Sequence, residues 1–271
     1  MNGTAKTVPM QSDTNQTLQR AFALLDSFSI DRPELGVREV ARLTGLSSST
    51  AGRLLAALRD LGVLNQNQTT RTYSLGAKVL AWSGVYTAGL DVRSQALPVM
   101  EELLEQTQET ISLYVLEGNE RVCVERLEST QSVRIVARIG RRLSLYAGAG
   151  GKAILAFLPE DRREEILAGL PLKPLTSQTI IDPQALRNEL EKIRFEGVAI
   201  SHGEWILDAS GVAAPILGPQ AETVAALTIS GPAQRFTGAA VDIYARRVAR
   251  AALLISRKLG YSRGAFGIYS A

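Results

Sequence analysis

The segment of this sequence best suited to binding chemistry is a turn at residues 148–153, which read Gly-Ala-Gly-Gly-Lys-Ala. The pattern matches the G-x-G-x-x-A fingerprint of dinucleotide-binding proteins, and it stands between a predicted strand and a predicted helix. Glycines in such a turn allow backbone amides to approach an anionic ligand closely. A nucleotide-dependent oxidoreductase that uses this turn is therefore one interpretation of the sequence.

Other features of the sequence argue against nucleotide binding. The chain shows no succession of alternating strands and helices, and no strand ends in an acidic residue about 20 positions further on, as a doubly wound dinucleotide-binding fold requires. A phosphate-binding P-loop is excluded because Tyr146 replaces its first glycine and Ala153 replaces its Ser or Thr. We expect Lys152 to face solvent or a partner acid rather than to form a Schiff base.

The other reactive side chains are few. The chain has a single histidine, His202, and a single cysteine, Cys123, which together cannot supply most zinc sites. One cysteine excludes an internal disulfide and favours a reducing, cytoplasmic setting. His202 has no partner at metal-ligand spacing, and Cys123 lies in an alternating segment typical of a buried, inert thiol. We therefore expect no enzyme, no metal and no cofactor.

A second set of residues is suited to DNA. Small hydroxyl side chains at the start of a helix allow it to enter the major groove, and the helix N-terminal amides can hold a phosphate. An arginine in the first turn can contact a phosphate, or a guanine through two hydrogen bonds. The candidate DNA contacts are Ser47, Ser48, Ser49, Thr50, Arg53 and, in a strand pair further on, Arg71.

The elements around these residues have the order of a winged helix-turn-helix. Apolar residues at helical spacing predict a helix over 17–28 and a short helix over 37–43, which Gly45 ends. Hydroxyl N-caps then open a third helix that ends at Gly62. Residues 63–75 predict two short strands with a polar tip. The simpler alternative is a small helical subdomain in which the serines only cap a helix.

The second half of the chain predicts a larger α/β domain. Residues 77–108 are helical, with possible interruptions at Gly89 and Pro98, and short strands follow on both sides of Gly118-Asn119. Residues 132–139 alternate between apolar and polar and predict a half-buried strand. Further predicted elements are a helix after the glycine turn, a helix over 183–196 with Asp182 as its N-cap, strands within 198–205 and 212–230, and a final helix.

Length and composition limit the number of domains and the class of protein. The chain has 271 residues, of which 45% are hydrophobic and 21% charged, which fits one large or two ordinary globular domains. The net charge is +3, and the first 80 residues, with nine basic and six acidic side chains, account for the whole excess. No run approaches the length of a membrane span, and the polar start of the chain does not read as a secretory signal.

These motifs resemble a known family. Residues 36–62, GVREVARLTGLSSSTAGRLLAALRDLG, look like the winged helix-turn-helix of IclR-family bacterial transcriptional regulators, as do the Arg53-Leu54-Leu55 step and the Tyr73-Ser74-Leu75-Gly76 exit. The A-x-x-x-G-K-A turn at 147–153 and the segment at 197–211 resemble that family's effector-binding domain. The resemblance extends from about residue 17 to residue 259.

The resemblance implies an α+β fold with an N-terminal winged helix-turn-helix and a C-terminal GAF-like mixed α/β effector-binding domain, joined by a linker helix. The expected boundaries are a disordered arm at 1–14, a DNA-binding domain at 15–76, a linker helix at 77–89, an effector-binding domain at 90–262 and a C-terminal tail at 263–271.

The family's effector pocket, transferred residue by residue, assigns Ala149 and Gly150 as backbone donors. The other expected pocket residues are Leu143, Leu145, Ser201, Ala209, Gly211 and Ser230. Ser201 stands where some members have an acidic residue and Gly211 where some have cysteine, so the effector itself does not transfer. A mostly apolar wall with a few hydroxyls suits a small organic or aromatic acid.

The expected function is a sequence-specific transcriptional regulator whose affinity for a double-stranded DNA operator is controlled by a small metabolite. The resemblance adds a homodimer, or a dimer of dimers, and no membrane partner. A regulator whose second domain only dimerises is the other alternative. Activation or repression stays open, as does a ligand contact from His202 or Glu204.

Overall fold

The computed structural model describes residues 13–29, 31–88, 91–135 and 138–269. Contacts within the chain divide it into two compact units, Met1–Tyr86 and Thr87–Ala271. The predicted arm at residues 1–14 lies outside the described residues as far as residue 12, and the first helix already begins at Asp13. The expected linker helix at 77–89 corresponds to α4, Lys78–Ala88.

The N-terminal unit combines three helices with a small sheet. The helices are α1 (Asp13–Leu25), α2 (Val37–Thr44) and α3 (Ser48–Asp60). The strands β1 (Glu34–Leu35), β2 (Leu64–Gln66) and β3 (Tyr73–Leu75) form an antiparallel sheet in the order β1-β3-β2. One hydrophobic cluster joins helices and sheet, and its fully buried side chains include Leu24, Val40, Leu55 and Leu64. β1 was not predicted, because two residues are too few to show a periodic pattern.

Local chemistry fixes the turn between α2 and α3. Gly45 ends α2 in the left-handed region at φ 70°, which glycine adopts without steric cost. Ser47 caps α3, because its hydroxyl oxygen accepts a hydrogen bond from the backbone N–H of Thr50 at 3.2 Å. The two predicted signals, the glycine stop and the hydroxyl cap, are confirmed at these positions.

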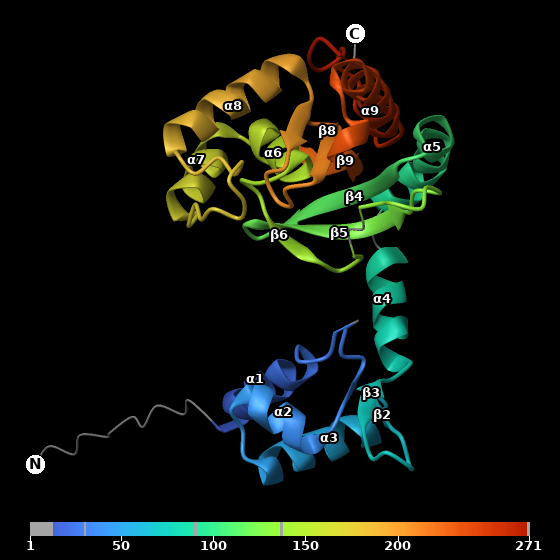
Figure 1. Cartoon of the computed structure of the whole chain (residues 1–271), viewed down its shortest axis with the longest axis vertical. Coiled ribbons are helices and arrows are strands. Elements are labelled where there is room, and N and C mark those ends of the chain that lie inside the picture. Colours follow the sequence, from blue (N-terminus) through green and yellow to red (C-terminus); the bar gives the residue numbers. More distant parts are fainter. Residues whose placement is uncertain (1–12, 30, 89–90, 136–137, 270–271) are drawn as a thin grey trace, which may run out of the picture. The chain divides into compact units, whose positions relative to one another are not determined.

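The C-terminal unit is built on a six-stranded sheet (Figure 1). Its strands are β4 (Thr110–Glu117), β5 (Glu120–Leu127), β6 (Arg142–Ser144), β7 (Ala199–His202), β8 (Ala209–Leu217) and β9 (Thr223–Pro232). Their order is β6-β5-β4-β9-β8-β7, and every pairing is antiparallel. A doubly wound nucleotide-binding sheet is parallel, so this topology does not support the nucleotide interpretation.

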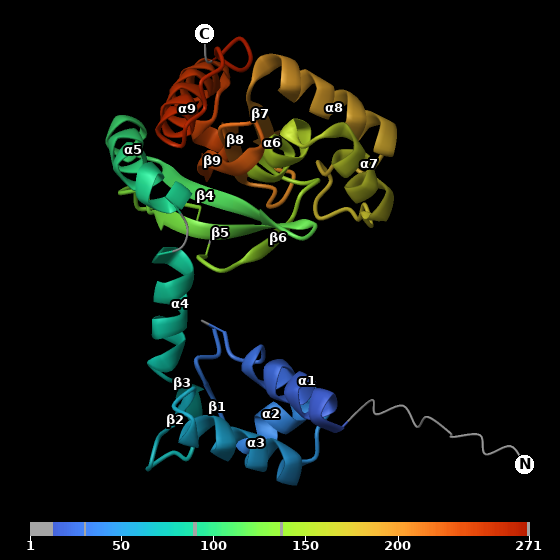
Figure 2. The same ribbon diagram turned by 180° about the vertical axis from the view of Figure 1, so that it is seen from behind.

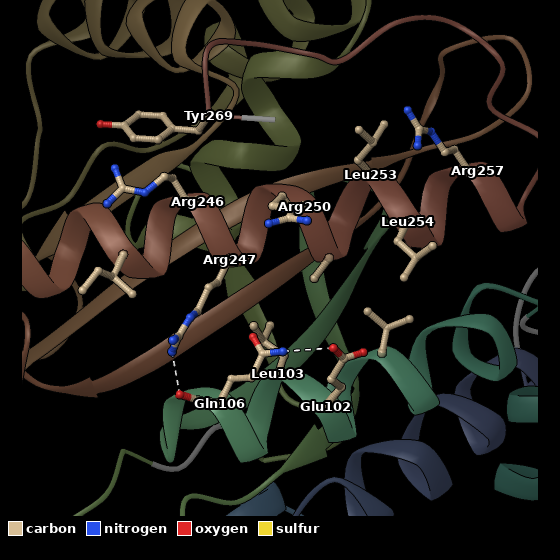
Figure 3. A pocket seen from close by; sticks show the side chains of 13 residues that line it. Glu102, Leu103, Gln106, Arg246, Arg247, Arg250, Leu253, Leu254, Arg257 and Tyr269 are labelled. Atoms are coloured by element: carbon tan, nitrogen blue, oxygen red, sulfur yellow. Dashed lines mark hydrogen bonds between the residues drawn. The ribbon is translucent and has the colours of Figure 1, made fainter. Parts of the chain in front are cut away.

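Helices cover both faces of this sheet (Figures 1 and 2). α5 (Asp91–Thr107) and α9 (Gly238–Lys258) pack on one face, where a hydrogen bond of 2.5 Å joins Arg247 to the carbonyl oxygen of Gln106 (Figure 3). α6 (Ala149–Phe157), α7 (Glu160–Gly169) and α8 (Pro183–Glu196) pack on the other face. Pro98 lies inside α5, which continues through the position where an interruption was possible.

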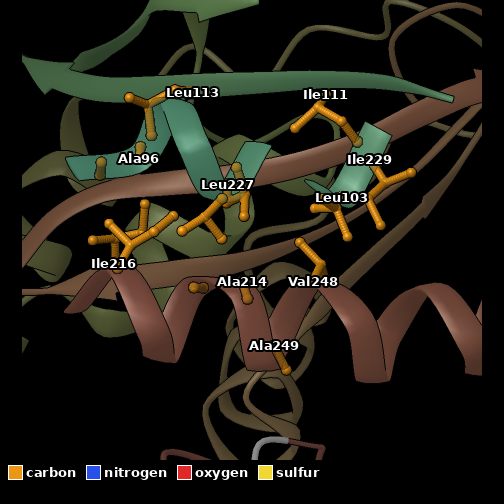
Figure 4. Packing of buried hydrophobic residues seen from close by; sticks show 14 of the residues in the cluster. Ala96, Leu103, Ile111, Leu113, Ala214, Ile216, Leu227, Ile229, Val248 and Ala249 are labelled. Carbon is orange, nitrogen blue, oxygen red and sulfur yellow. The ribbon is translucent and has the colours of Figure 1, made fainter. Parts of the chain in front are cut away.

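Alternate residues of the central strands pack into the two hydrophobic clusters, one on each face of the sheet. Ala214, Leu227 and Ile229 pack against α5 and α9 (Figure 4), whereas Ala213 and Ala226 pack against α6 and its neighbours. Both faces of β8 and β9 are therefore buried, which explains why their sequences are almost continuously apolar.

The predicted strand at 132–139 is wrong. None of its described residues, 132–135 and 138–139, is in a strand, and Val133 and Ile139 are 65% and 56% exposed. The segment is a loop whose Val133 carbonyl accepts a hydrogen bond of 3.0 Å from Arg235. The strand beside β5 comes later, at β6, where Glu120 pairs with Ser144. Alternation alone does not provide a strand with a partner.

A glycine contact in the N-terminal unit generates a stability prediction. A Cβ at Gly76 would lie 2.5 Å from the carbonyl oxygen of Gly62. We expect Gly76→Ala to lower the free energy of unfolding by about 1–3 kcal/mol, because the backbone must move to relieve the overlap between the new Cβ and this oxygen. The measurement is urea unfolding followed by circular dichroism. Gly84→Ala is the matched control, since a Cβ there meets nothing within 4 Å; equal midpoints for the two variants would contradict the prediction.

Candidate functional site

The N-terminus of α3 presents the predicted DNA contacts on an exposed surface. Ser47, Ser48, Ser49 and Arg53 are exposed, and Thr50 is half-buried. The Ser47 hydroxyl is already engaged, because it also donates to Thr50 Oγ1 at 2.9 Å and lies 3.1 Å from Ser49 Oγ. Ser47 therefore fixes the start of the helix, and Ser48 and Arg53 project from it into solvent.

Arg71 lies in the loop between β2 and β3. Asn67 Oδ1 accepts hydrogen bonds from the backbone N–H of Thr69 at 2.9 Å and of Thr70 at 3.2 Å, which shapes the tip of the loop. Arg71 has a φ of 61°, a left-handed conformation unusual for a residue with a side chain. Its side chain is exposed and, like that of Arg53, makes no ion pair with any described residue. Both guanidinium groups are free to meet a phosphate.

A pocket in the C-terminal unit gathers the predicted effector residues. Its lining includes every one of them except Leu145: Leu143, Ala149, Gly150, Ser201, Ala209, Gly211 and Ser230. Leu145 is fully buried in the hydrophobic core beside the pocket, so its place in the pocket wall is corrected. All six strands of the sheet contribute lining residues, and the start of α6 contributes the others of the predicted set.

Glycine brings the start of α6 close to the sheet. A Cβ at Gly150 would lie 2.8 Å from Thr228 Oγ1 and 3.2 Å from the ring of Tyr114. Gly148 precedes the helix at φ 82°, a conformation that favours glycine. The glycine pattern of the turn thus serves close packing of helix on sheet, and it leaves the amides of Ala149 and Gly150 at the pocket.

A buried ion pair holds this turn against the loop that follows β7. Lys152 is 1% exposed, and its Nζ donates to Glu204 Oε1 at 2.6 Å, to Glu189 Oε1 at 2.8 Å and to the carbonyl oxygen of Ile200 at 2.9 Å. The second oxygen of Glu204 accepts from the backbone N–H of Gly148 at 2.9 Å. The expectation that Lys152 meets a partner acid is confirmed. Glu204 already holds the first amide of the turn, so a ligand must use the following ones.

Residues outside the predicted effector set also line the pocket. They include Tyr114, Arg121, Arg141, Trp205 and Thr228. Arg121 is buried, donates to the carbonyl oxygen of Ala147 at 2.8 Å, and lies with its guanidinium carbon 5.3 Å from the centre of the Tyr114 ring. They come from separate strands and loops, and no local pattern signals that they converge.

Two buried polar atoms of the lining lack partners among the described residues, Arg121 Nε and Thr228 Oγ1. Burial lowers the pKa of Arg121, yet a guanidinium remains charged in proteins. Burial raises the pKa of Tyr114, so its phenol stays neutral. Buried polar atoms that are left unpaired cost free energy, which a polar ligand can recover by bonding to them.

At the rim, the guanidinium carbon of the exposed Arg141 lies 4.3 Å from the centre of the Trp205 ring, a cation–π contact. His202 and Glu204 are not among the lining residues. His202 Nδ1 lies 3.1 Å from Ser210 Oγ, and Glu204 is held by Lys152. Burial raises the pKa of the Cys123 thiol to about 11, so the thiol stays protonated and unreactive at neutral pH.

Within the described part of the chain, no group of three or more His, Cys, Asp and Glu side chains could hold a metal ion. Among the same residues, no helix has the length and apolarity needed to cross a membrane.

Comparisons with known proteins agree with this architecture. Residues 17–68 match the family model of the IclR helix-turn-helix domain, and residues 84–257 match that of the bacterial transcriptional regulator IclR C-terminal domain. The HTH-type transcriptional regulator KipR of Bacillus subtilis is 36% identical over 248 residues, which cover 92% of this chain and 98% of KipR.

Solved structures of IclR-family proteins are also similar to this chain. The crystal structure of the Thermotoga maritima IclR is 33% identical with a TM-score of 0.78, and the match covers 92% of this chain and 100% of that one. An IclR homologue from Microbacterium hydrocarbonoxydans, solved in complex with 4-hydroxybenzoate, is 30% identical with a TM-score of 0.77 over 90% of this chain and 99% of that one.

This chain belongs to the IclR family and is a DNA-binding transcriptional regulator with an α+β fold. The relatives named here are regulators, not enzymes, and nothing in the fold or in the comparisons supports an oxidoreductase.

The buried pair generates a stability prediction. We expect Lys152→Met to lower the free energy of unfolding by about 3–5 kcal/mol, because it leaves the carboxylate of Glu204 buried without its cation. Chemical denaturation measures the loss. The matched control is Arg187→Met, which removes an exposed ion pair to Glu164 of 2.9 Å and should cost about 0–1 kcal/mol. Losses of similar size in the two variants would refute a structural role for the buried pair.

Proposed function

We propose that this regulator binds its operator sequence-specifically and that a small organic or aromatic acid, bound in the C-terminal unit, controls its affinity for DNA. The observation that carries the proposal is the pocket at the start of α6, in which Arg121 Nε and Thr228 Oγ1 are buried without partners. The complex of the related Microbacterium protein with 4-hydroxybenzoate supports the same ligand class.

The chemistry of the lining favours an aromatic or other small carboxylate. Arg121 and Arg141 provide positive charge, and the amides of Ala149 and Gly150 lie at the positive end of the α6 dipole. Tyr114 and Trp205 offer ring surfaces on which an aromatic acid can pack. The pocket has a volume of about 70 Å³, which restricts the ligand to a small molecule.

For the DNA-binding half we propose that Ser48, Ser49, Thr50 and Arg53 enter the major groove. Ser47 positions them by capping α3, and its neighbouring amides face a phosphate. Arg71, at the tip of the wing, contacts the backbone or the minor groove. The proposed division of labour is a DNA-binding domain at 15–76, a linker helix at 77–89, an effector-binding domain at 90–262 and a tail at 263–271.

We further propose that the regulator works as a homodimer, because one winged helix reads too few base pairs for a unique genomic site. The N-terminal unit exposes apolar side chains suited to pairing. On α1, Leu18 and Phe22 are 55% and 63% exposed, and on α4, Leu80 and Val85 are 75% and 77% exposed. Ligand binding then shifts the population between arrangements of the paired DNA-binding domains, with α4 as the lever.

Arg53 provides the test of DNA contact. We expect Arg53→Ala to weaken operator binding by a factor of about 10 to 100 and to relax base preference at one position, because a bidentate arginine contributes about 1–3 kcal/mol. Fluorescence anisotropy over a salt series measures it, on DNA from upstream of the protein's own gene or from genomic selection. Arg194→Ala, at an exposed arginine of α8, is the control. Unchanged affinity and preference would remove Arg53 from the contact set.

Ser201 provides the test of ligand control. We expect Ser201→Phe to fill the pocket and abolish both the thermal stabilisation by small acids, 4-hydroxybenzoate first, and the change in DNA affinity. DNA binding without ligand should persist. The control is His202→Phe at the next residue of β7, which is exposed and outside the lining. If no acid of a panel stabilises the wild-type protein, the C-terminal unit is not a sensor of this class.

A further inference from the structure

The loop between β2 and β3 holds Arg71 in an unusual backbone conformation. Three described residues other than glycine have a positive φ, and Arg71, at 61°, is the one that lies in the N-terminal unit. Glycine adopts this left-handed conformation without steric cost, whereas a residue with a side chain is strained there. Such strain persists only where the surroundings fix it, and it is concentrated at functional sites. A cationic side chain at a position that favours glycine therefore indicates a use for that side chain.

The backbone of Arg71 is bonded on both sides. Its N–H donates to the carbonyl oxygen of Asn67 at 2.9 Å, and its carbonyl oxygen accepts from Nε2 of Gln66 at 3.3 Å. Gln66 is the last residue of β2 and is half-buried, whereas Arg71 is exposed and makes no ion pair with any described residue. The loop therefore fixes the backbone of this arginine and leaves its guanidinium group available.

Gln66 is itself fixed by α3. Its Oε1 accepts a hydrogen bond from Nη1 of Arg59 at 3.0 Å. Arg59 is held in turn by Asp60, whose Oδ1 accepts from Nε at 2.9 Å and from Nη2 at 2.7 Å. Arg59 and Asp60 end α3, which lies beside β2 and β3 (Figures 1 and 2). The path from Arg59 through Gln66 to Arg71 is called the wing relay below. Because both atoms of the Gln66 amide are bonded, the relay sets its orientation.

The far end of the loop is tied to β1. Thr72 Oγ1 donates to Oε2 of Glu34 at 2.8 Å and lies 2.7 Å from Thr70 Oγ1. Glu34 belongs to β1, which pairs with β3. The loop is thus anchored to α3 at one end and to β1 at the other, so a polar and largely exposed segment keeps a defined shape.

We propose that Gln66 is a positioning residue for DNA binding, which holds Arg71 at a fixed place relative to α3. The inference rests on the proposed contact of Arg71 with DNA. Arg53 and Arg59 lie on the same helix, about 9 Å apart along its axis. The wing relay therefore sets the separation between the proposed groove contact and the proposed wing contact. A wing whose shape is set before binding loses less conformational freedom when it meets the DNA backbone.

The simpler alternative is that Gln66 only stabilises the strand pair. Its bond to Arg71 ends on the backbone carbonyl oxygen, so Arg71→Ala removes the guanidinium group and keeps the bond. A structural role of Gln66 then affects DNA binding equally with and without that guanidinium group, whereas a positioning role matters only in its presence. A double-mutant cycle separates the two roles.

The test is this cycle in the full-length protein, read by fluorescence anisotropy on operator DNA over a salt series. We expect Arg71→Ala to weaken binding about tenfold and to reduce the slope of log affinity against log salt by about 1, because one phosphate contact is lost. Gln66→Met keeps the length of the side chain and removes both hydrogen bonds. It should weaken binding about 3–10-fold in the presence of Arg71 and less than about twofold in the Arg71→Ala background.

Gln68→Met is the matched control, because it makes the same exchange at an exposed residue of the same loop, outside the wing relay. Its effect on binding should not depend on Arg71. A second variant, Arg59→Met, removes the donor that fixes Gln66 and should show the same dependence on Arg71. It decides the matter if Gln66→Met lowers the thermal midpoint.

Two results would overturn the inference in distinguishable ways. Equal losses for Gln66→Met in both backgrounds, or no loss in either, would exclude the positioning role and leave the wing contact in place. Unchanged binding by Arg71→Ala would exclude the wing contact together with the relay, and the Arg53→Ala measurement then shows separately whether the groove contact stands.

Discussion

The C-terminal unit depends on one buried electrostatic contact, the bond between Lys152 and Glu204. A lysine that is 1% exposed is stable as a cation only with full compensation, and here two carboxylates and a carbonyl oxygen provide it. Because Glu204 also holds the amide of Gly148, the same contact fixes the start of α6 and the loop that carries Trp205. The wall and the rim of the pocket are thus set by one pair.

In the DNA-binding half, too, a few residues fix the start of one helix. The Ser47 cap and the left-handed Gly45 define where α3 begins, and the hydroxyls and Arg53 take their positions from that start. In both halves, the side chains proposed to meet a ligand stand next to side chains that fix a helix N-terminus. The precision of each site comes from the neighbours of its contact residues rather than from the contact residues themselves.

Local patterns in the sequence predicted most of the fold. The caps at Ser47 and Asp182, the strands around Gly118 and the helix after the glycine turn all follow from signals within a few residues. The false strand at 132–139 and the missed β1 share a cause, because whether a segment pairs depends on a distant partner. The pocket also depends on contacts between distant parts of the chain. Lys152 and Glu204 are 52 positions apart, and Arg121 and Thr228 come from different strands.

The alternation of β8 and β9 has a consequence for redesign. Thr228 and Ser230 line the pocket, whereas their neighbours Leu227 and Ile229 are buried in the opposite layer, so different side chains of one strand serve the pocket and the core. Exchanging a side chain of the lining leaves the anchors and the buried ion pair unchanged. Under the proposed effector control, the domain is a scaffold for biosensors, in which new analytes are selected by varying a few strand positions and leaving the buried layers unchanged.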